Sequence, residues 1–276
     1  MLMNDPMPER AGQGVPLKRL EWERFSGRLE LGENEIHLWR IGVDDEASLG
    51  GGFSCLSREE QERGERFRFE KDRRSHRVTH TVKRLLLGAY LGRSPESLRF
   101  GTGPWGKPHL MEGHGGTSLE FNLSHSRGVT LIGMARQPSL GVDVEAMQRV
   151  ERMQPIFRRF ASRFEQAELS RTGRISDELT LTAWWVSKEA FVKAVGRGLS
   201  LGLDQFSLGM PDRGPWSVRK LPEEWGGDDD YWLILFRVGA THLGGLVRRG
   251  RPSRVRAYQW DAGLGRGFQE TGGSGG

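Results

Sequence analysis

The pattern of polar and apolar positions predicts several short strands. Residues 35–41 alternate between the two kinds of residue, so that Ile36, Leu38 and, by extension, Ile41 would pack against a core. A period of two residues is typical of a strand with one apolar side. Short apolar runs between glycine-rich turns predict further strands at 98–100, 121–124, 129–135, 140–145, 206–208, 232–238 and 242–247.

The same pattern predicts two long helices. Apolar residues recur at helical spacing over residues 72–90 and again over 180–195. Each helix follows a Ser-x-x-Glu sequence that is typical of a helix start, and each is followed by a glycine that would end it. These positions are Ser57, Glu60 and Gly92 for the first, and Ser162, Glu165 and Gly196 for the second. The order of elements thus occurs twice, which indicates two related halves.

The bounds of the fold follow from where this periodicity stops. Residues 1–16 and 259–276 are rich in glycine and polar residues and lack a hydrophobic period. We therefore expect the first segment to be disordered and the second to be a flexible tail. Between them we place an N-terminal half at residues 17–140 and a C-terminal half at 141–258. Helices and strands in this order predict the α+β fold class.

Composition excludes several classes of protein. The 276 residues contain one cysteine, so an internal disulfide is excluded, and no histidine lies near Cys55 at zinc-ligand spacing. The longest apolar run, at 231–236, is far shorter than the ~20 residues of a membrane span, and the start of the chain lacks a signal-peptide core. We therefore expect a cytoplasmic protein without membrane contact. Its net charge of +5 suits nucleic acid, anionic lipid, phosphorylated ligands or an acidic protein alike.

Three acidic residues and a lysine are the first candidates for chemistry. Asp143 and Glu145 are one residue apart in an apolar strand, so their side chains share a face. Carboxylates held so close repel each other, and a hard cation such as Mg²⁺ is a common resolution, although a strand ending in two solvated acids is the alternative. Glu189 and Lys193 lie four residues apart on one helix face, which by itself is typical of a surface ion pair.

A second group of candidates carries groups that suit phosphate. Ser124 and His125 come at the end of a predicted strand, where a hydroxyl, an imidazole and backbone amides can bind phosphate oxygens. A nucleophilic Ser–His pair is the alternative, but no Gly-x-Ser-x-Gly surrounds Ser124, and strand neighbours point to opposite faces. Lys107 lies between a glycine and a proline that fix the loop, so it is either a fixed phosphate ligand or a solvated loop lysine.

Taken together, these motifs resemble the Sfp-type 4'-phosphopantetheinyl transferase family. The resemblance covers about residues 35–250. It rests on G-K-P at 106–108, F-N-x-S-H-S at 121–126, G-V-D-V-E at 141–145, R-F-x-S-x-x-E at 159–165 and W-x-x-K-E-A-x-x-K-x-x-G-x-G-L at 185–199. It implies two pseudo-symmetric α+β halves, each a small antiparallel sheet packed on a long helix, in agreement with the repeated order of elements.

The resemblance also implies a reaction. The 4'-phosphopantetheine arm of coenzyme A would move to a serine hydroxyl of an acyl- or peptidyl-carrier protein, with release of 3',5'-ADP. Asp143, Glu145 and Glu189 would hold Mg²⁺, with Mn²⁺ as the alternative, and Asp143, Glu189 and Lys193 would carry catalysis. The general base is Glu189 or a water on the metal.

Coenzyme A contacts follow from the same resemblance. Its phosphates would contact Lys107, Ser124, His125 and Lys193, and further candidates for its 3'-phosphate are Arg63, Lys71 and Arg74. Glu165 also matches the family, but its Ser-x-x-Glu context makes a helix cap the simpler interpretation. We expect a monomer whose partners are coenzyme A and acidic apo carrier proteins, and the sequence does not identify the carrier or the pathway.

Two alternative functions belong to other classes. A nucleic-acid-binding protein is suggested by the basic balance and by the arginines at 248, 249, 251, 254 and 256. Acidic residues interleave with the basic ones over residues 58–84, and no nucleic-acid-binding motif occurs, so we expect no nucleic-acid partner. A non-catalytic relative that binds coenzyme A or a carrier protein is the other alternative. The presence of all three candidate metal carboxylates argues against it.

Overall fold

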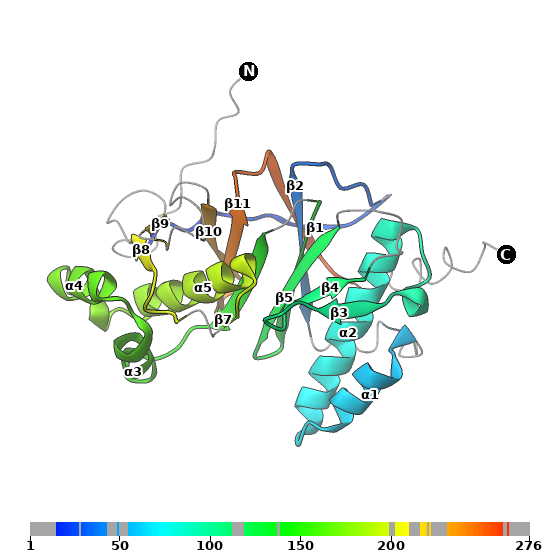
Figure 1. Cartoon of the computed structure of the whole chain (residues 1–276), viewed down its shortest axis with the longest axis horizontal. Helices are drawn as coiled ribbons and strands as arrows, with labels where there is room; N and C mark the ends of the chain where they lie inside the picture. The colour runs from blue at the N-terminus through cyan, green and yellow to red at the C-terminus, as the bar shows by residue number, and fades with distance from the viewer. Residues whose placement is uncertain are drawn as a thin grey trace. The chain divides into compact units, whose positions relative to one another are not determined.

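The chain folds into helices and small sheets that form two compact units, shown in the computed structural model of Figure 1. The structure describes residues 15–27, 29–42, 49, 55–111, 119–136, 139–198, 202–209, 216–219, 221, 231–261 and 264. Unit 1 comprises residues 1–20, 104–107 and 139–251, and unit 2 comprises 21–103, 108–138 and 252–276. The predicted α+β class is confirmed. None of the helices in the described part of the chain has the length and apolarity needed to cross a membrane.

Unit 1 is built on a three-stranded antiparallel sheet with the order β10-β11-β7. Its strands are β7 (Leu140–Ala146), β10 (Tyr231–Val238) and β11 (His242–Arg249). The helices are α3 (Val150–Phe160), α4 (Arg163–Arg171), the 3-10 turn η4 (Arg174–Ser176) and α5 (Glu178–Val195), and a small hairpin is formed by β8 (Ser207–Gly209) and β9 (Ser217–Arg219). The long helix α5 packs across β7 and β11 (Figure 1).

Two glycines allow α5 to approach the sheet at backbone distance. A Cβ atom added at Gly141 would lie 1.9 Å from the carbonyl oxygen of Ala190, and one at Gly245 would lie 2.6 Å from Cγ1 of Val186. Neither distance is allowed for a real carbon atom, so any larger residue would push the helix away. Gly141 and Gly245 therefore mark the face of the sheet that α5 covers.

Unit 2 contains a five-stranded sheet with the order β1-β12-β2-β6-β5. Its strands are β1 (Trp22–Arg24), β2 (Glu35–Gly42), β5 (Glu120–Ser126), β6 (Val129–Ala135) and β12 (Arg254–Gln259). The helices are α1 (Arg58–Glu65), α2 (Glu70–Leu91) and the 3-10 turn η3 (Pro95–Ser97), and β3 (Phe100–Thr102) pairs with β4 (Pro108–Leu110).

The sheet of unit 2 is mixed, whereas an antiparallel sheet is predicted. Strand β12 runs parallel to both β1 and β2. Most of unit 1 separates it from β2 along the chain, so no hairpin imposes an antiparallel direction. The arginines that suggest a basic run are divided between the sheets, because Arg248 and Arg249 end β11 and Arg254 and Arg256 lie in β12.

The predicted helices and most predicted strands are confirmed with bounds within two residues. The strand predicted at 98–100 is wrong, because Leu98 ends the 3-10 turn η3 and only Phe100 begins a strand. The described fold also extends beyond the expected bounds. Val15 and Trp260 are only 3% and 1% exposed, because each apolar side chain finds a core to bury in. The remainder of the expected terminal segments lies outside the described residues.

Both predicted helix starts and both glycine stops are confirmed, one set in each unit. Ser57 and Ser162 cap α1 and α4, and in each case the glutamate three residues later bonds back to the backbone N–H of the serine. Gly92 and Gly196 end α2 and α5 in the left-handed conformation, with φ of 62° and 75°. The simpler interpretation of Glu165 as a helix-capping residue is thereby confirmed.

Candidate functional site

The first two candidate residues lie on β7, on the face that α5 covers. Asp143 is paired in register with Gly245, and Glu145 with Leu243. Because directly opposed residues of an antiparallel pair share a face, Asp143 lies on the same side as Gly245, against α5. Asp143 is 3% exposed and Glu145 is half-buried. The alternative of two solvated acids at a strand end is therefore wrong for Asp143.

The helix α5 supplies the other two members of the cluster. Lys193 donates from Nζ to Oδ1 of Asp143 over 2.7 Å, a charge-assisted hydrogen bond with a buried acceptor. The structure thus places the ion pair of Lys193 across the helix–sheet contact, 50 residues back along the chain, instead of along the helix surface. The sequence spacing suggested a pair with Glu189, which is half-buried one turn earlier.

The charges of both acids of β7 affect the pKa of Glu189. Burial first, and then the carboxylates of Asp143 and Glu145, raise its pKa to about 7 in total, and Lys193 opposes this rise. The three carboxylates therefore share one electrostatic environment in which a positive charge is favoured. A glutamate with a pKa near neutrality can also accept or release a proton at the pH of a cell.

The raised pKa of Glu189 predicts a pH-dependent stability. Between pH 4.5 and about 7 the folded protein holds this proton more tightly than the unfolded chain, so ionisation lowers the free energy of unfolding as the pH rises. In metal-free buffer, Glu189→Gln is expected to match the wild type at pH 5 and to exceed it by about 2 kcal/mol at pH 8. Urea unfolding at both pH values measures this, with the exposed Glu65→Gln as control. An identical pH slope in Glu189→Gln and wild type would contradict it.

The donor chemistry of the three carboxylates suits a hard cation, but their geometry does not form a closed site. Carboxylate oxygens are the ligands that Mg²⁺ prefers. Within the described ranges, however, no three side chains of His, Cys, Asp or Glu come together as a metal-binding group. In this structure the ammonium of Lys193 neutralises Asp143.

Lys107 is held in place within unit 1. It donates from Nζ to the carbonyl oxygen of Leu140, the first residue of β7, over 3.1 Å. A Cβ atom added at Gly196 would lie 3.3 Å from its Cδ, so the side chain passes the end of α5. Gly106 before it has a φ of 82°, a conformation that favours glycine. A fixed lysine agrees with this geometry, and a freely solvated loop lysine does not.

The remaining predicted residues all belong to unit 2. Ser124 and His125 lie within β5 and not after it, paired with Leu131 and Thr130 of β6. Ser124 is buried and His125 is exposed, as expected for strand neighbours on opposite faces. Further candidates come from α1 and α2, where Arg63 and Lys71 are exposed and Arg74 is half-buried.

One buried ion pair next to the cluster is absent from the predicted site residues. Lys188 immediately precedes Glu189, and its ammonium lies 2.9 Å from Oε1 of Glu165, with both side chains fully buried. Burial lowers the pKa of Lys188 to about 8, against the effect of Glu165. A signal existed in the sequence, because the capping-box glutamate and a lysine are separated by 23 residues in both units.

The chain is similar to two protein-family models and to several known proteins. A family model described as the 4'-phosphopantetheinyl transferase superfamily matches residues 139–242, and one described as 4'-phosphopantetheinyl transferase, N-terminal, matches residues 45–137. The 4'-phosphopantetheinyl transferase HetI of Nostoc sp. is 30% identical over 202 residues, which cover 73% of this chain and 85% of that protein. Two such enzymes of Bacillus subtilis, ffp and Sfp, are 31% and 30% identical over 62% of this chain and 73% of their own length.

Proposed function

The chain belongs to the 4'-phosphopantetheinyl transferase superfamily and is an enzyme of this type, and we propose that it moves the phosphopantetheine arm of coenzyme A to a serine of an apo carrier protein with Mg²⁺. Coenzyme A and carrier proteins are the partners of this family. The observation that carries the proposal for the site is the ion pair of Lys193 with the buried Asp143, beside the half-buried Glu189.

In the proposed reaction, the serine Oγ of the carrier bonds to the phosphorus that carries pantetheine. The bond from this phosphorus to the bridging oxygen of the pyrophosphate breaks, and 3',5'-ADP leaves with that oxygen. Such phosphoryl transfers depend on positioning and on neutralising charge. Glu189 would take the proton of the serine hydroxyl. Its pKa is raised toward neutrality in the metal-free protein, and a bound Mg²⁺ would lower that pKa.

The cation and the lysines would neutralise the pyrophosphate. Asp143, Glu145 and Glu189 would hold Mg²⁺, or Mn²⁺ in its place, and the metal would supply positive charge to the pyrophosphate oxygens. In this assignment Lys193 would contact the pyrophosphate when coenzyme A is bound. Lys107 would hold a phosphate group of coenzyme A, as would the unit 2 residues Ser124, His125, Arg63, Lys71 and Arg74.

Charge and cysteine content support two further parts of the proposal. The net charge of +5 and exposed arginines such as Arg152 and Arg158 on α3 would favour an acidic carrier protein. The single Cys55 is buried, and burial raises its pKa to about 11, so it is kept as an unreactive thiol that suits the reducing cytoplasm.

We propose that the enzyme works in the cytoplasm as a monomer, which light scattering after size-exclusion chromatography would test.

Mass spectrometry of an apo carrier protein tests the reaction directly. Incubation with coenzyme A, Mg²⁺ and this protein is expected to add one phosphopantetheine mass to the carrier serine, and chelation of the metal is expected to remove the activity. A serine-to-alanine carrier is the control and should gain no mass. Retention of coenzyme A or carrier without any mass gain, across a panel of apo carriers, would contradict the proposal and indicate a binding protein.

A further inference from the structure

The buried pair of Lys188 and Glu165 makes hydrogen bonds to four backbone groups. Besides the ion pair, Lys188 donates from Nζ to the carbonyl oxygens of Leu203 and Phe206 over 2.7 and 2.6 Å. Glu165 accepts from the backbone N–H of Ser162 through Oε2 and from that of Leu208 through Oε1, each over 2.8 Å. One ammonium and one carboxylate thus join α5 to the start of α4 and to the segment that leads into β8.

This pair lies on the side of α5 that faces away from the sheet. At about 100° per residue, Lys188 is nearly opposite Ala190, and Glu189 lies between them. The Ala190 side is fixed by its backbone-close contacts with Gly141 and Gly245. The helix is therefore fixed on two opposite sides, and the residue between them is the candidate base. Neither a rotation nor a translation of α5 is possible without breaking one of these contacts.

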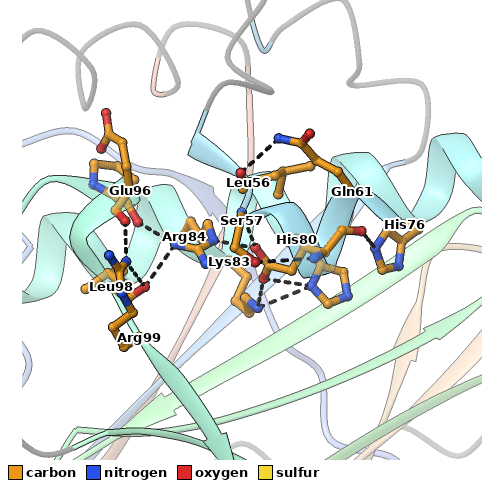
Figure 2. A network of polar contacts seen from close by, with 12 residues as sticks. Leu56, Ser57, Gln61, His76, His80, Lys83, Arg84, Glu96, Leu98 and Arg99 are labelled. Atoms are coloured by element: carbon orange, nitrogen blue, oxygen red, sulfur yellow. Dashed lines mark hydrogen bonds and ion pairs between the residues drawn. The ribbon is translucent and has the colours of Figure 1, made fainter. Parts of the chain in front are cut away.

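Unit 2 contains the same arrangement without an acidic residue after the lysine. Lys83 of α2 lies 2.7 Å from Oε1 of Glu60, the capping-box glutamate of α1. Lys83 and Lys188 even lie at similar distances, 3.9 and 3.8 Å, from the ring centroids of Phe100 and Phe206. Figure 2 labels His80, Lys83 and Arg84, whose side chains contact Glu60.

The residue that follows the lysine differs between the units. In unit 2 it is Arg84, which donates to Glu60 over 2.6 Å and to the carbonyl oxygens of Pro95 and Leu98 (Figure 2). In unit 1 it is Glu189, which is close enough to Asp143 and Glu145 of β7 for their charges to raise its pKa. The buried lysine–glutamate pair is therefore followed by a structural arginine in unit 2 and by the candidate base in unit 1. Unit 2 therefore serves as an internal control, because it contains the buried lysine–glutamate pair without a candidate base after the lysine.

We propose that Lys188 and Glu165 are positioning residues for transfer, which fix α5 so that Glu189 and Lys193 stand at their working positions. The proposal rests on the function proposed above. A buried ion pair is a weak source of stability compared with an apolar pair of equal volume, so stability alone gives little reason for it. Positioning is a better reason for the buried ion pair, because a displacement of about 1 Å of a catalytic group can cost about 100-fold in rate.

The test compares Lys188→Met with the matched control Lys83→Met. Both variants remove a buried ammonium from a long helix and leave a side chain of similar length, so both are expected to lower the melting temperature. Transfer rates are then measured at a temperature at which both are fully folded. We expect Lys188→Met to lower kcat at least tenfold and to raise the Mg²⁺ concentration for half-maximal rate. Lys83→Met should keep both values within about twofold of the wild type.

A double variant separates positioning from folding. In Glu165→Gln with Lys188→Met both buried charges are gone, and glutamine can still close the capping box, so the melting temperature is expected to recover. The rise in melting temperature on adding Mg²⁺ is measured as well and is expected to stay smaller than in the wild type. The proposal predicts that kcat stays low in the double variant. Recovery of kcat together with stability would overturn it, as would a folded Lys188→Met with wild-type kcat.

These results are distinguishable from a failure of the proposed function. If the wild type gives no mass gain on any apo carrier in this assay, the function itself is wrong. If the wild type transfers and only the comparison between the two lysine variants fails, the positioning role alone is wrong. The double variant decides the second question even where Lys188→Met does not fold.

Discussion

Asp143→Asn is expected to reduce phosphopantetheine transfer about 1000-fold while leaving the protein folded. The substitution keeps the size of a side chain that is 3% exposed, and removes only its charge. That charge is the partner of Lys193 and is proposed as a Mg²⁺ ligand, so its loss affects both cations that would neutralise the pyrophosphate. A 1000-fold loss corresponds to about 4 kcal/mol of transition-state stabilisation, a plausible share for a metal-assisted phosphoryl transfer.

The stability of this variant is expected to change little, for two opposing reasons. Lys193 loses its ion pair, but it is 26% exposed and can be solvated. Glu189 loses a repulsive neighbour, which lowers its pKa toward the ordinary value and favours the folded state at neutral pH. Initial rates from the mass-shift assay and thermal melts by circular dichroism measure the two properties separately.

A second Asp→Asn substitution in the same unit supplies the control. Asp177 caps the N-terminus of α5 through its hydrogen bond to the N–H of Thr180, and asparagine caps a helix equally well. Asp177→Asn is therefore expected to transfer at a rate within about twofold of the wild type. If Asp143→Asn keeps more than a tenth of the wild-type rate at saturating Mg²⁺, Asp143 is neither a metal ligand nor essential for the reaction.

The elements that position this site could be predicted because local sequence determines them. Strand β7 follows from the apolar run at 140–145, which places Asp143 and Glu145 on one face wherever the strand packs. Helix α5 follows from its apolar spacing, the serine cap of the preceding helix and the stop at Gly196. In β7 the backbone period fixes which neighbours share a face, so the prediction for Asp143 and Glu145 is correct. In β2 the prediction of one apolar side is wrong, because the strand is buried on both faces and Ile41 joins the core on the side of Trp39.

Contacts between elements could not be predicted in the same way. The spacing of Glu189 and Lys193 suggested a pair along the helix, but the partner of Lys193 is Asp143, because α5 crosses β7 at that point. Nothing local to Lys193 specifies this crossing. It depends on Gly141 and Gly245, whose absent side chains allow the helix to lie on the sheet.

The buried partner of Lys188 was missed for a related reason. A lysine in a helix is ordinarily a surface residue, and a capping-box glutamate ordinarily has only its cap to satisfy. Both expectations fail here, since Lys188 and Glu165 are fully buried and satisfy each other. The recurrence of the same pair as Lys83 and Glu60 was visible only as a shared spacing, and a spacing of 23 residues has no meaning until both helices are placed.

Gly141→Ala is expected to lower the free energy of unfolding by about 3 kcal/mol and to abolish transfer. The added methyl group would lie 1.9 Å from the carbonyl oxygen of Ala190 and 2.4 Å from the backbone nitrogen of Ala194. These are main-chain atoms in the last two turns of α5, so no side-chain rotation relieves the overlap and the helix itself must move. Moving α5 separates Lys193 from Asp143. One substitution is therefore expected to lower both the stability of this unit and its activity.

Urea unfolding followed by tryptophan fluorescence measures the stability loss, with Gly32→Ala in unit 2 as the control. The three atoms nearest to a Cβ atom at Gly32 all belong to the side chain of Glu35, at 3.1 Å, and that flexible chain can give way. The control is therefore expected to stay within about 0.5 kcal/mol of the wild type. If Gly141→Ala is equally well tolerated, α5 does not rest on β7 at backbone distance, and the ion pair of Lys193 with Asp143 must be held by other contacts.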